Sequence, residues 1–285
     1  MKKIRILALA LSLTMLCACA ANQPTGEEVP DIDQETVQPE KTSVPVYTYE
    51  DKMASRQFTD EETGILYATY SYSVPMMQIA NADLLTEEAL AAAQRNAAAF
   101  NEYMQSILDE SISYGEEMGA DFDIGYSNSW PIADEKKMTA SQTGEIVTVC
   151  VECYFFSGGA HPYAFTSSHT FDLAAGKFID PSQIGDDPES FRVKAAALLV
   201  AKAESLGEEY TAGYWDDYAE IISHWNESAV LFDGNGMTVI FAPYDLGPYA
   251  MGSVELALTY EELADAIGEG GLKLLGVLPS ETNEA

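Results

Sequence analysis

The chain has 285 residues, of which 14 are Lys or Arg and 46 are Asp or Glu, and its formal net charge is −32. Such an acidic chain is not expected to bind nucleic acid or anionic lipid head groups, because binding to phosphate depends on Lys and Arg. Hydrophobic residues make up 47% of the chain, which excludes a disordered composition and suffices for one large or two modest domains. The charge instead favours solubility and attraction to cationic partners.

The N-terminus predicts export and a lipid anchor. Basic residues near the start precede a short apolar segment, Ile6 to Leu16. This segment is shorter than the ~20 apolar residues that span a bilayer and is typical of a signal peptide. It ends in Leu16-Cys17-Ala18-Cys19, the pattern of a bacterial lipobox, which predicts removal of residues 1–18 and lipidation of Cys19. The alternative is ordinary signal-peptide cleavage near Ala20 or Ala21, which would release the protein.

The predicted organisation places a folded region behind a tether. Residues 19–45 carry four prolines among acidic and small polar residues, a composition typical of a flexible linker. We expect two α+β modules after it, residues 46–177 and 178–268, and a C-terminal tail at 269–285. The expected location is the outer face of the cell membrane, with the lipid as the only membrane attachment.

The first module is expected to combine strands with one long helix. From Leu66 to Val74 the sequence has the period-two alternation of a half-buried strand. One set of positions is Leu66, Ala68, Tyr70, Tyr72 and Val74, and the other is Tyr67, Thr69, Ser71 and Ser73. Thr86 is a good N-cap for a helix whose apolar residues recur every three or four positions. Gly115 and Gly119 are expected to mark the end of this helix. Further strands are predicted at Ile124–Ile132, Ile146–Phe156 and Phe165–Leu173.

The second module has a helix and a hairpin. Asp187 as N-cap, Pro188 in the first turn and Gly207 beyond the end predict a helix. The turn Asp233–Gly236 predicts a hairpin. The flanking strands are expected at Val230–Phe232 and Met237–Ala242, with a strand at Ser253–Leu258 and a short helix at Tyr260–Ile267. Because strands and helices are segregated, the predicted fold class is α+β: antiparallel sheets, with one long helix in the first module and one helix plus a hairpin sheet in the second.

Cys150 and Cys153 have the spacing of a redox or zinc motif, but their context argues against both. The surrounding residues are β-branched and aromatic, hence a strand, where residues three apart point to opposite faces about 10 Å apart. A disulfide needs Cα atoms within about 7 Å, and zinc would need further ligands. Both residues are therefore predicted to be packed thiols.

Two turn-rich segments are the candidate binding loops. The first, Ser157–Tyr163, holds two glycines and the candidate residues His161 and Tyr163. The second, Phe241–Gly252, holds Tyr244 and Tyr249. The structural alternative, a tight connection between strands, is favoured for the first segment and stays open for the second. An acidic aromatic run is a weaker candidate, because its spacing is more typical of a helix packing on the core: Tyr210, Tyr214, Trp215, Tyr218 and Trp225.

No catalytic motif is recognisable, and no cofactor or metal is expected. The sequence has three histidines and lacks the HExxH, GxSxG and P-loop patterns. The acidic pairs Asp121/Asp123 and Asp216/Asp217 do not fit a calcium loop and are expected to be solvated. The alternative to a binding module is an enzyme that acts on cell-wall glycans through a carboxylate such as Glu152 or Asp172.

Three segments together resemble a known family. Gly158-Gly159-Ala160-His161-Pro162, then Thr170–Lys177 and Pro243–Gly252, are similar to the extracytoplasmic domain of RsiV-type anti-sigma factors and to the non-catalytic N-terminal region of PdaC-type peptidoglycan deacetylases. The resemblance spans roughly residues 45–268. In the anti-sigma factor it implies a receptor domain that binds lysozyme. No sigma-binding segment, spanning helix or deacetylase domain is recognisable here, so only an extracellular binding function is expected to carry over. The expected partner is lysozyme, another cationic protein, or a cell-wall component such as peptidoglycan.

Overall fold

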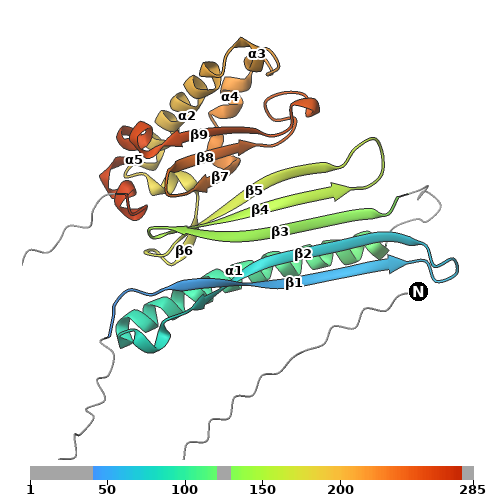
Figure 1. The fold of residues 1–285 in the computed structure, drawn as a ribbon, viewed down its shortest axis with the longest axis horizontal. Helices are drawn as coiled ribbons and strands as arrows, with labels where there is room; N and C mark the ends of the chain where they lie inside the picture. Colours follow the sequence, from blue (N-terminus) through green and yellow to red (C-terminus); the bar gives the residue numbers. More distant parts are fainter. Residues whose placement is uncertain (1–40, 121–129, 278–285) are drawn as a thin grey trace, which may run out of the picture. The chain divides into compact units, whose positions relative to one another are not determined.

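The computed structural model describes residues 41–120 and 130–277, and from Glu40 onward the chain forms one compact unit. It contains a six-stranded sheet in the order β1-β2-β3-β4-β5-β6 and a three-stranded sheet in the order β7-β8-β9 (Figure 1). Helices accompany both sheets, so the α+β fold class is confirmed. Cys19 and the pair Asp121/Asp123 lie outside the described residues.

The six-stranded sheet is antiparallel except at one place. Its strands β2 and β3 run parallel, and every other neighbouring pair runs antiparallel. A parallel pair needs a crossover connection, which helix α1 (Glu87–Ala120) supplies between these two strands. The strands are β1 (Tyr47–Thr59), β2 (Leu66–Ile79), β3 (Ile132–Thr143), β4 (Ile146–Phe156), β5 (Tyr163–Asp172) and β6 (Lys177–Ile179).

Two strands of this sheet differ from the prediction. β1 was not expected, because it is an edge strand exposed over most of its length and its charged residues conceal the alternation. A strand at Ile124–Ile132 was expected, but residues 121–129 lie outside the described part, and the described strand begins at Ile132 and continues to Thr143. The predictions for β2, β4 and β5 are confirmed to within a few residues.

Helix α1 begins as predicted but does not end as predicted. The Thr86 hydroxyl accepts the backbone N–H of Ala89 at 3.3 Å, which is the expected N-cap contact. Gly115 lies inside the helix, so the prediction that it marks the end is wrong, whereas Gly119 lies next to the last described helical residue, Ala120. A Cβ at Gly115 would lie 2.5 Å from the Tyr70 ring, and one at Gly119 would lie 2.3 Å from the Phe58 ring. These glycines let the helix backbone approach the aromatic side chains of β1 and β2.

The C-terminal part follows the sequence prediction up to Ile267. Beyond a kink at Gly268 the last helix continues to Leu274, where a C-terminal tail was expected, because Leu272 and Leu275 are buried in a hydrophobic core. The Asp187 carboxylate accepts the N–H of Ser190, so Asp187 is the N-cap of α2 as predicted, and the predicted hairpin is β7–β8. The elements are α2 (Pro188–Ser205), α3 (Glu208–Thr211), α4 (Tyr218–Ile222), β7 (Ala229–Phe232), β8 (Gly236–Phe241), β9 (Val254–Thr259) and α5 (Tyr260–Leu274). Short 3₁₀ turns lie at Ala82–Leu84, Pro181–Ile184, Trp225–Glu227 and Tyr249–Met251.

The two sheets have separate cores that meet at one edge. The first core packs α1 on β2 to β5, and the second packs α2 and α5 on β7 to β9. Ile146 of β4 belongs to the second core. The Val230 N–H donates to the Ser168 hydroxyl at 2.7 Å, and the Thr143 hydroxyl donates to the Phe232 carbonyl at 3.3 Å. These contacts fix strand β7 against the first sheet.

Candidate functional site

The loop between β4 and β5 turns on two glycines. Gly158 and Gly159 have φ angles of 93° and 104°, in the region that favours glycine, as the sequence predicts. His161 follows them, and its Nδ1 lies 3.0 Å from the Pro162 carbonyl oxygen. Because a carbonyl oxygen can only accept, Nδ1 carries the proton in this contact. The loop therefore holds the imidazole in one orientation.

The loop between β8 and β9 contains a tyrosine in an unusual backbone conformation. Tyr244 has a φ of 78°, the only positive φ of a non-glycine residue among the described residues, and its side chain is 52% exposed. The indole N–H of Trp215 donates to its carbonyl oxygen at 3.0 Å, and the Asp245 carboxylate accepts the N–H of Ala242 at 2.7 Å. Neighbouring contacts thus maintain a conformation that costs about 1–3 kcal/mol for a side chain larger than glycine.

The two loops meet, although they come from different sheets. The His161 and Tyr249 rings stack with their centroids 3.8 Å apart, and the Tyr249 hydroxyl donates to the Pro162 carbonyl at 2.7 Å. Tyr244 lies beside Tyr249, with 5.4 Å between ring centroids. Burial and then the nearby Asp245 and Tyr244 raise the pKa of Tyr163, which places Tyr163 next to the same loop.

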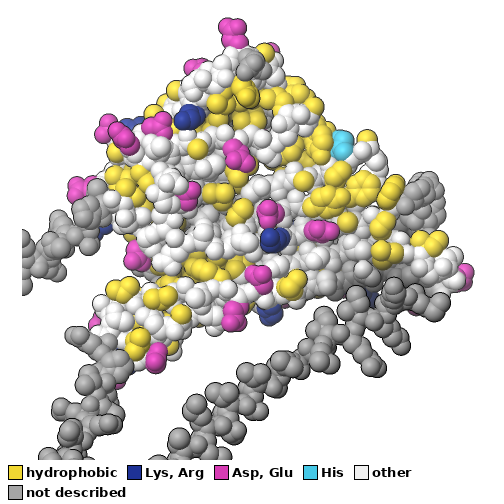
Figure 2. All heavy atoms as spheres, viewed as in Figure 1, with side chains coloured by type: hydrophobic (Ala, Val, Ile, Leu, Met, Phe, Trp, Pro, Cys, Tyr) yellow, Lys and Arg dark blue, Asp and Glu magenta, His cyan; other side chains and the backbone are white. Residues whose placement is uncertain are grey.

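We call His161, Tyr163, Trp215, Tyr244 and Tyr249 the junction cluster. All four residues proposed from the two loops belong to it. Trp215 was not among them, since the aromatic run was expected to pack as one helix. That run instead divides between short helices and turns: Tyr214 and Trp225 are buried, whereas Trp215 is 42% exposed and contacts the β8–β9 loop. On the face shown in Figure 2, hydrophobic side chains lie beside a histidine side chain, drawn in cyan.

The junction cluster has the chemistry of a recognition surface. Its aromatic faces can stack on a planar group or attract a cation, and its hydroxyls can donate hydrogen bonds. Asp245, next to Tyr244, is the adjoining negative charge. No cysteine, serine or lysine nucleophile belongs to the cluster, and His161 already donates to a backbone carbonyl. This arrangement suits binding better than acid–base chemistry.

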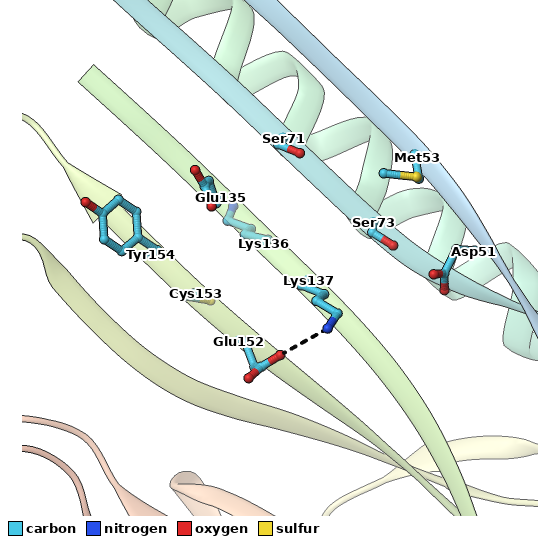
Figure 3. A pocket seen from close by; sticks show the side chains of 10 residues that line it. All are labelled: Asp51, Met53, Ser71, Ser73, Glu135, Lys136, Lys137, Glu152, Cys153 and Tyr154. Atoms are coloured by element: carbon cyan, nitrogen blue, oxygen red, sulfur yellow. Dashed lines mark ion pairs between the residues drawn. The ribbon is translucent and has the colours of Figure 1, made fainter. Parts of the chain in front are cut away.

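A second feature is a groove of about 440 Å³ on the face of the first sheet away from α1 (Figure 3). The small side chains Ser71 and Ser73 of β2 line it, with longer side chains from the neighbouring strands around them. The Lys137 ammonium lies 3.9 Å from the Glu152 carboxylate, and in Figure 3 the two side chains point toward one another. Glu152, one of the carboxylates suggested for an enzyme, is thus paired with Lys137 in an open groove that carries both positive and negative side chains.

Asp172, the other carboxylate suggested for an enzyme that acts on cell-wall glycans, lies far from this groove. Asp172 ends β5 and accepts the N–H of Ala175 at 3.0 Å in the following turn. Glu152 lies opposite Thr166 in the register, six positions from Asp172. Six strand residues span roughly 20 Å, whereas paired catalytic carboxylates lie about 5–10 Å apart. Asp216 and Asp217 are exposed beside α4, as expected of solvated carboxylates.

Cys150 and Cys153 lie on β4 with their side chains on opposite faces, as predicted. In the register, Cys153 lies opposite Lys136 on the face that packs toward α1, and Cys150 lies opposite Thr139 on the other face. Both are free thiols. Burial raises the pKa of both, that of Cys153 to about 11. The strand geometry therefore separates the two sulfur atoms and keeps them protonated at neutral pH.

The second sheet and the helices before it carry a family signature. Residues 203–261 match the family model of a protein of unknown function, DUF3298. This DUF3298 segment includes Trp215, Tyr244 and Tyr249 of the junction cluster, whereas His161 and Tyr163 precede it. No curated protein matches the chain.

Two solved structures of DUF3298-family proteins resemble the chain over most of its length. One, from Bacteroides fragilis, has a TM-score of 0.57 and 15% identity, and the match covers 81% of this chain and 97% of that one. The other, from Pseudomonas aeruginosa, has a TM-score of 0.50 and 14% identity, with 80% and 96% covered. At such identities the likeness shows the fold alone. It is consistent with the extracytoplasmic domains that the sequence resembles.

In the part of the chain that the structure describes, no helix is both long enough and apolar enough to cross a membrane. Within the same residues, no three His, Cys, Asp or Glu side chains come together in a way that could hold a metal ion.

Proposed function

We propose that this chain is a non-catalytic binding module, held at the outer face of the cell membrane by a lipid on Cys19, and that it captures a cationic extracellular protein. Lysozyme is the first candidate, because the sequence resembles a lysozyme receptor domain and lysozyme is strongly basic. The module would bind its partner through the junction cluster. It would act either as a receptor or as an inhibitor that blocks the partner by binding to it.

The observation that carries this proposal is the convergence of two aromatic loops from different sheets. Tyr163, Trp215 and Tyr244 are each at least a third exposed, and Tyr249 is stacked against His161. Exposed Tyr and Trp side chains held in fixed positions are the residues that most often dominate the energy of protein interfaces. Their faces also attract Lys and Arg side chains by the cation–π interaction.

Charge supports the choice of a cationic partner. The chain carries a formal net charge of −32, so a basic protein is attracted over long distances and its association rate is raised. Such attraction is screened by salt within about 10 Å at 0.1 M and is not specific by itself. Specificity would therefore come from the junction cluster, and affinity at moderate salt should depend on its aromatic residues.

Titration of residues 40–285 with lysozyme tests the proposal. Tyr244→Ala removes the most exposed aromatic side chain of the cluster and should weaken binding about 30-fold, the effect of a typical interface hot spot. Tyr114→Ala is the matched control, because Tyr114 is 49% exposed on α1, close to the 52% of Tyr244. The control should bind within about twofold of the unchanged protein.

The outcomes separate specific recognition from charge attraction. One-to-one saturation that persists at about 0.3 M salt, with the loss confined to Tyr244→Ala, supports the proposal. Binding that disappears at that salt, or that responds equally to both variants, contradicts it. Retention of the protein by purified peptidoglycan without any binding to lysozyme would also contradict it and would point to a cell-wall ligand.

A further inference from the structure

Helix α1 covers only part of the first sheet. It packs chiefly along β2, and Figure 1 shows it behind β1 and β2. It reaches β5 through Phe100, which packs on Phe171, and through Tyr103, which contacts His169. A groove of about 500 Å³ opens between α1 and the same face of β3, β4 and β5. We call this the α1 groove. It shares no lining residue with the junction cluster, although the Phe165 ring at its edge lies 5.1 Å from the Tyr163 ring, and it is not needed by the function proposed above.

One end of the α1 groove holds a lysine without a close carboxylate. The Lys136 ammonium donates to the Ser111 hydroxyl at 3.3 Å and lies 5.3 Å from the Tyr72 ring and 5.8 Å from the Tyr114 ring. Within the described residues, no carboxylate lies within 4.0 Å of it. An ammonium has three donors, so two remain available to a ligand.

The acidic residues around Lys136 leave its ammonium group accessible to one anion. Asp134 faces the same side of β3, but its carboxylate is buried and accepts the Tyr72 hydroxyl at 2.7 Å. Glu110 lies on the exposed side of α1 at the rim of the groove. The nearest acids therefore neither cover the ammonium nor make the site strongly negative, which suits a ligand with a single negative charge better than a polyanion.

The rest of the groove is largely apolar. Strand register aligns Lys136 with Cys153 and Phe165 in one row across the sheet, and Met138 with Val151 in the next row. At the far end, the Tyr103 hydroxyl lies 3.2 Å from Nδ1 of His169. These two side chains also line a neighbouring hollow of about 350 Å³, so they form the wall between the two spaces.

We propose that the α1 groove binds an unbranched aliphatic carboxylate of medium chain length. The carboxylate lies on the Lys136 ammonium, and the chain follows Met138, Val151 and Phe165 toward the Tyr103–His169 pair. Burial lowers the pKa of His169, so this pair is neutral at neutral pH and does not compete for the carboxylate. A cationic amphiphile is repelled by the ammonium, and an uncharged one loses the charge-assisted hydrogen bonds that Lys136 supplies.

Calorimetric titration of residues 40–285 with decanoate, decanol and decyltrimethylammonium tests this assignment. Decanoate should bind one-to-one, and the other two, with the same chain, should bind at least about tenfold more weakly, since a charge-assisted hydrogen bond contributes about 1.5–3 kcal/mol. Lys136→Met should reduce the affinity for decanoate to the level of decanol. Lys137→Met is the matched control, because Lys137 is the next residue of β3, points to the opposite face and pairs with Glu152.

A second variant, Ser167→Leu, tests the proposal even if Lys136→Met does not fold. Ser167 lines the middle of the groove, and Ser167→Leu fills it while Lys136 stays in place. This variant should lose decanoate binding and keep its far-UV circular dichroism spectrum. The proposal is overturned if decanol binds as well as decanoate, if Lys137→Met weakens binding as much as Lys136→Met, or if Ser167→Leu still binds decanoate.

Discussion

The imidazole of His161 lies flat on the phenol ring of Tyr249, with centroids 3.8 Å apart and planes 16° from parallel. His161 belongs to a loop of the six-stranded sheet, and Tyr249 belongs to a loop of the three-stranded sheet. The Tyr249 hydroxyl reinforces this contact by donating to the Pro162 carbonyl. The stack joins two segments that are remote in the sequence, and the candidate binding surface exists only because they are joined.

Tyr244→Gly should separate stability from binding. Glycine adopts the φ of 78° without the strain that tyrosine bears, so the free energy of unfolding should stay the same or rise by up to about 1 kcal/mol. The hydrogen bond from Trp215 uses the backbone carbonyl and is retained. Binding to lysozyme should nevertheless fall as it does in Tyr244→Ala. Urea unfolding and the lysozyme titration measure the two effects, and a variant that loses stability would show that the side chain supports the loop.

Gly119→Ala should destabilise the first sheet. The added Cβ would lie 2.3 Å from the Phe58 ring, and overpacking of this kind costs about 1–3 kcal/mol, which exceeds the gain in helix propensity of up to about 1 kcal/mol. Ser113→Ala is the control, because Ser113 is exposed on the same helix and alanine should stabilise it by a few tenths of a kcal/mol. Thermal unfolding compares the two, and equal melting temperatures would contradict the close packing of α1.

Cys150 and Cys153 should alkylate slowly in the folded protein. Because burial raises the pKa of both thiols, that of Cys153 to about 11, the thiolate is a minor species at pH 8. The alkylation rate of Cys153 should rise with pH up to about 11. In urea both should react rapidly, with pKa values near 8.5. Since their folded pKa values are raised, the thiols contribute stability that is complete below the unfolded pKa and is lost as pH rises through the folded one.

Mass spectrometry of the unfolded protein provides the check on these thiols. Two free thiols should be found with and without reductant. A mass lower by two hydrogen atoms, mapped to this pair, would contradict the strand geometry that places the side chains on opposite faces.

Cys19→Ala tests the anchor. If Cys19 is lipidated, the wild-type protein should partition into the membrane fraction, and the variant should be either unprocessed or released. Cys17→Ala is the matched control, since it changes the neighbouring cysteine of the same segment and leaves the lipidated position intact. Normal processing and membrane partition of Cys19→Ala would rule out the lipid anchor.

Local chemistry in the sequence was enough to predict most elements of the fold. Thr86 and Asp187 cap their helices as predicted, because an N-cap depends only on a side-chain oxygen and on a backbone N–H two or three residues later. The β7–β8 hairpin follows from its turn residues, and strand β4 follows from its β-branched and aromatic run. The positive φ angles of Gly158 and Gly159 were also predictable, since the residue type itself permits them.

The remaining features of the fold and of the candidate site depend on contacts between segments that are distant in the sequence. Gly115 and Gly119 look like helix terminators in the sequence, and only the rings of Tyr70 and Phe58 show that they permit close approach. Trp215 looks like part of one amphipathic helix, and only the β8–β9 loop shows why its ring stays at the surface. The sequence proposed His161 and Tyr249 separately, as residues of two loops. Their meeting depends on how two sheets pack, a long-range property that no local pattern of residues encodes.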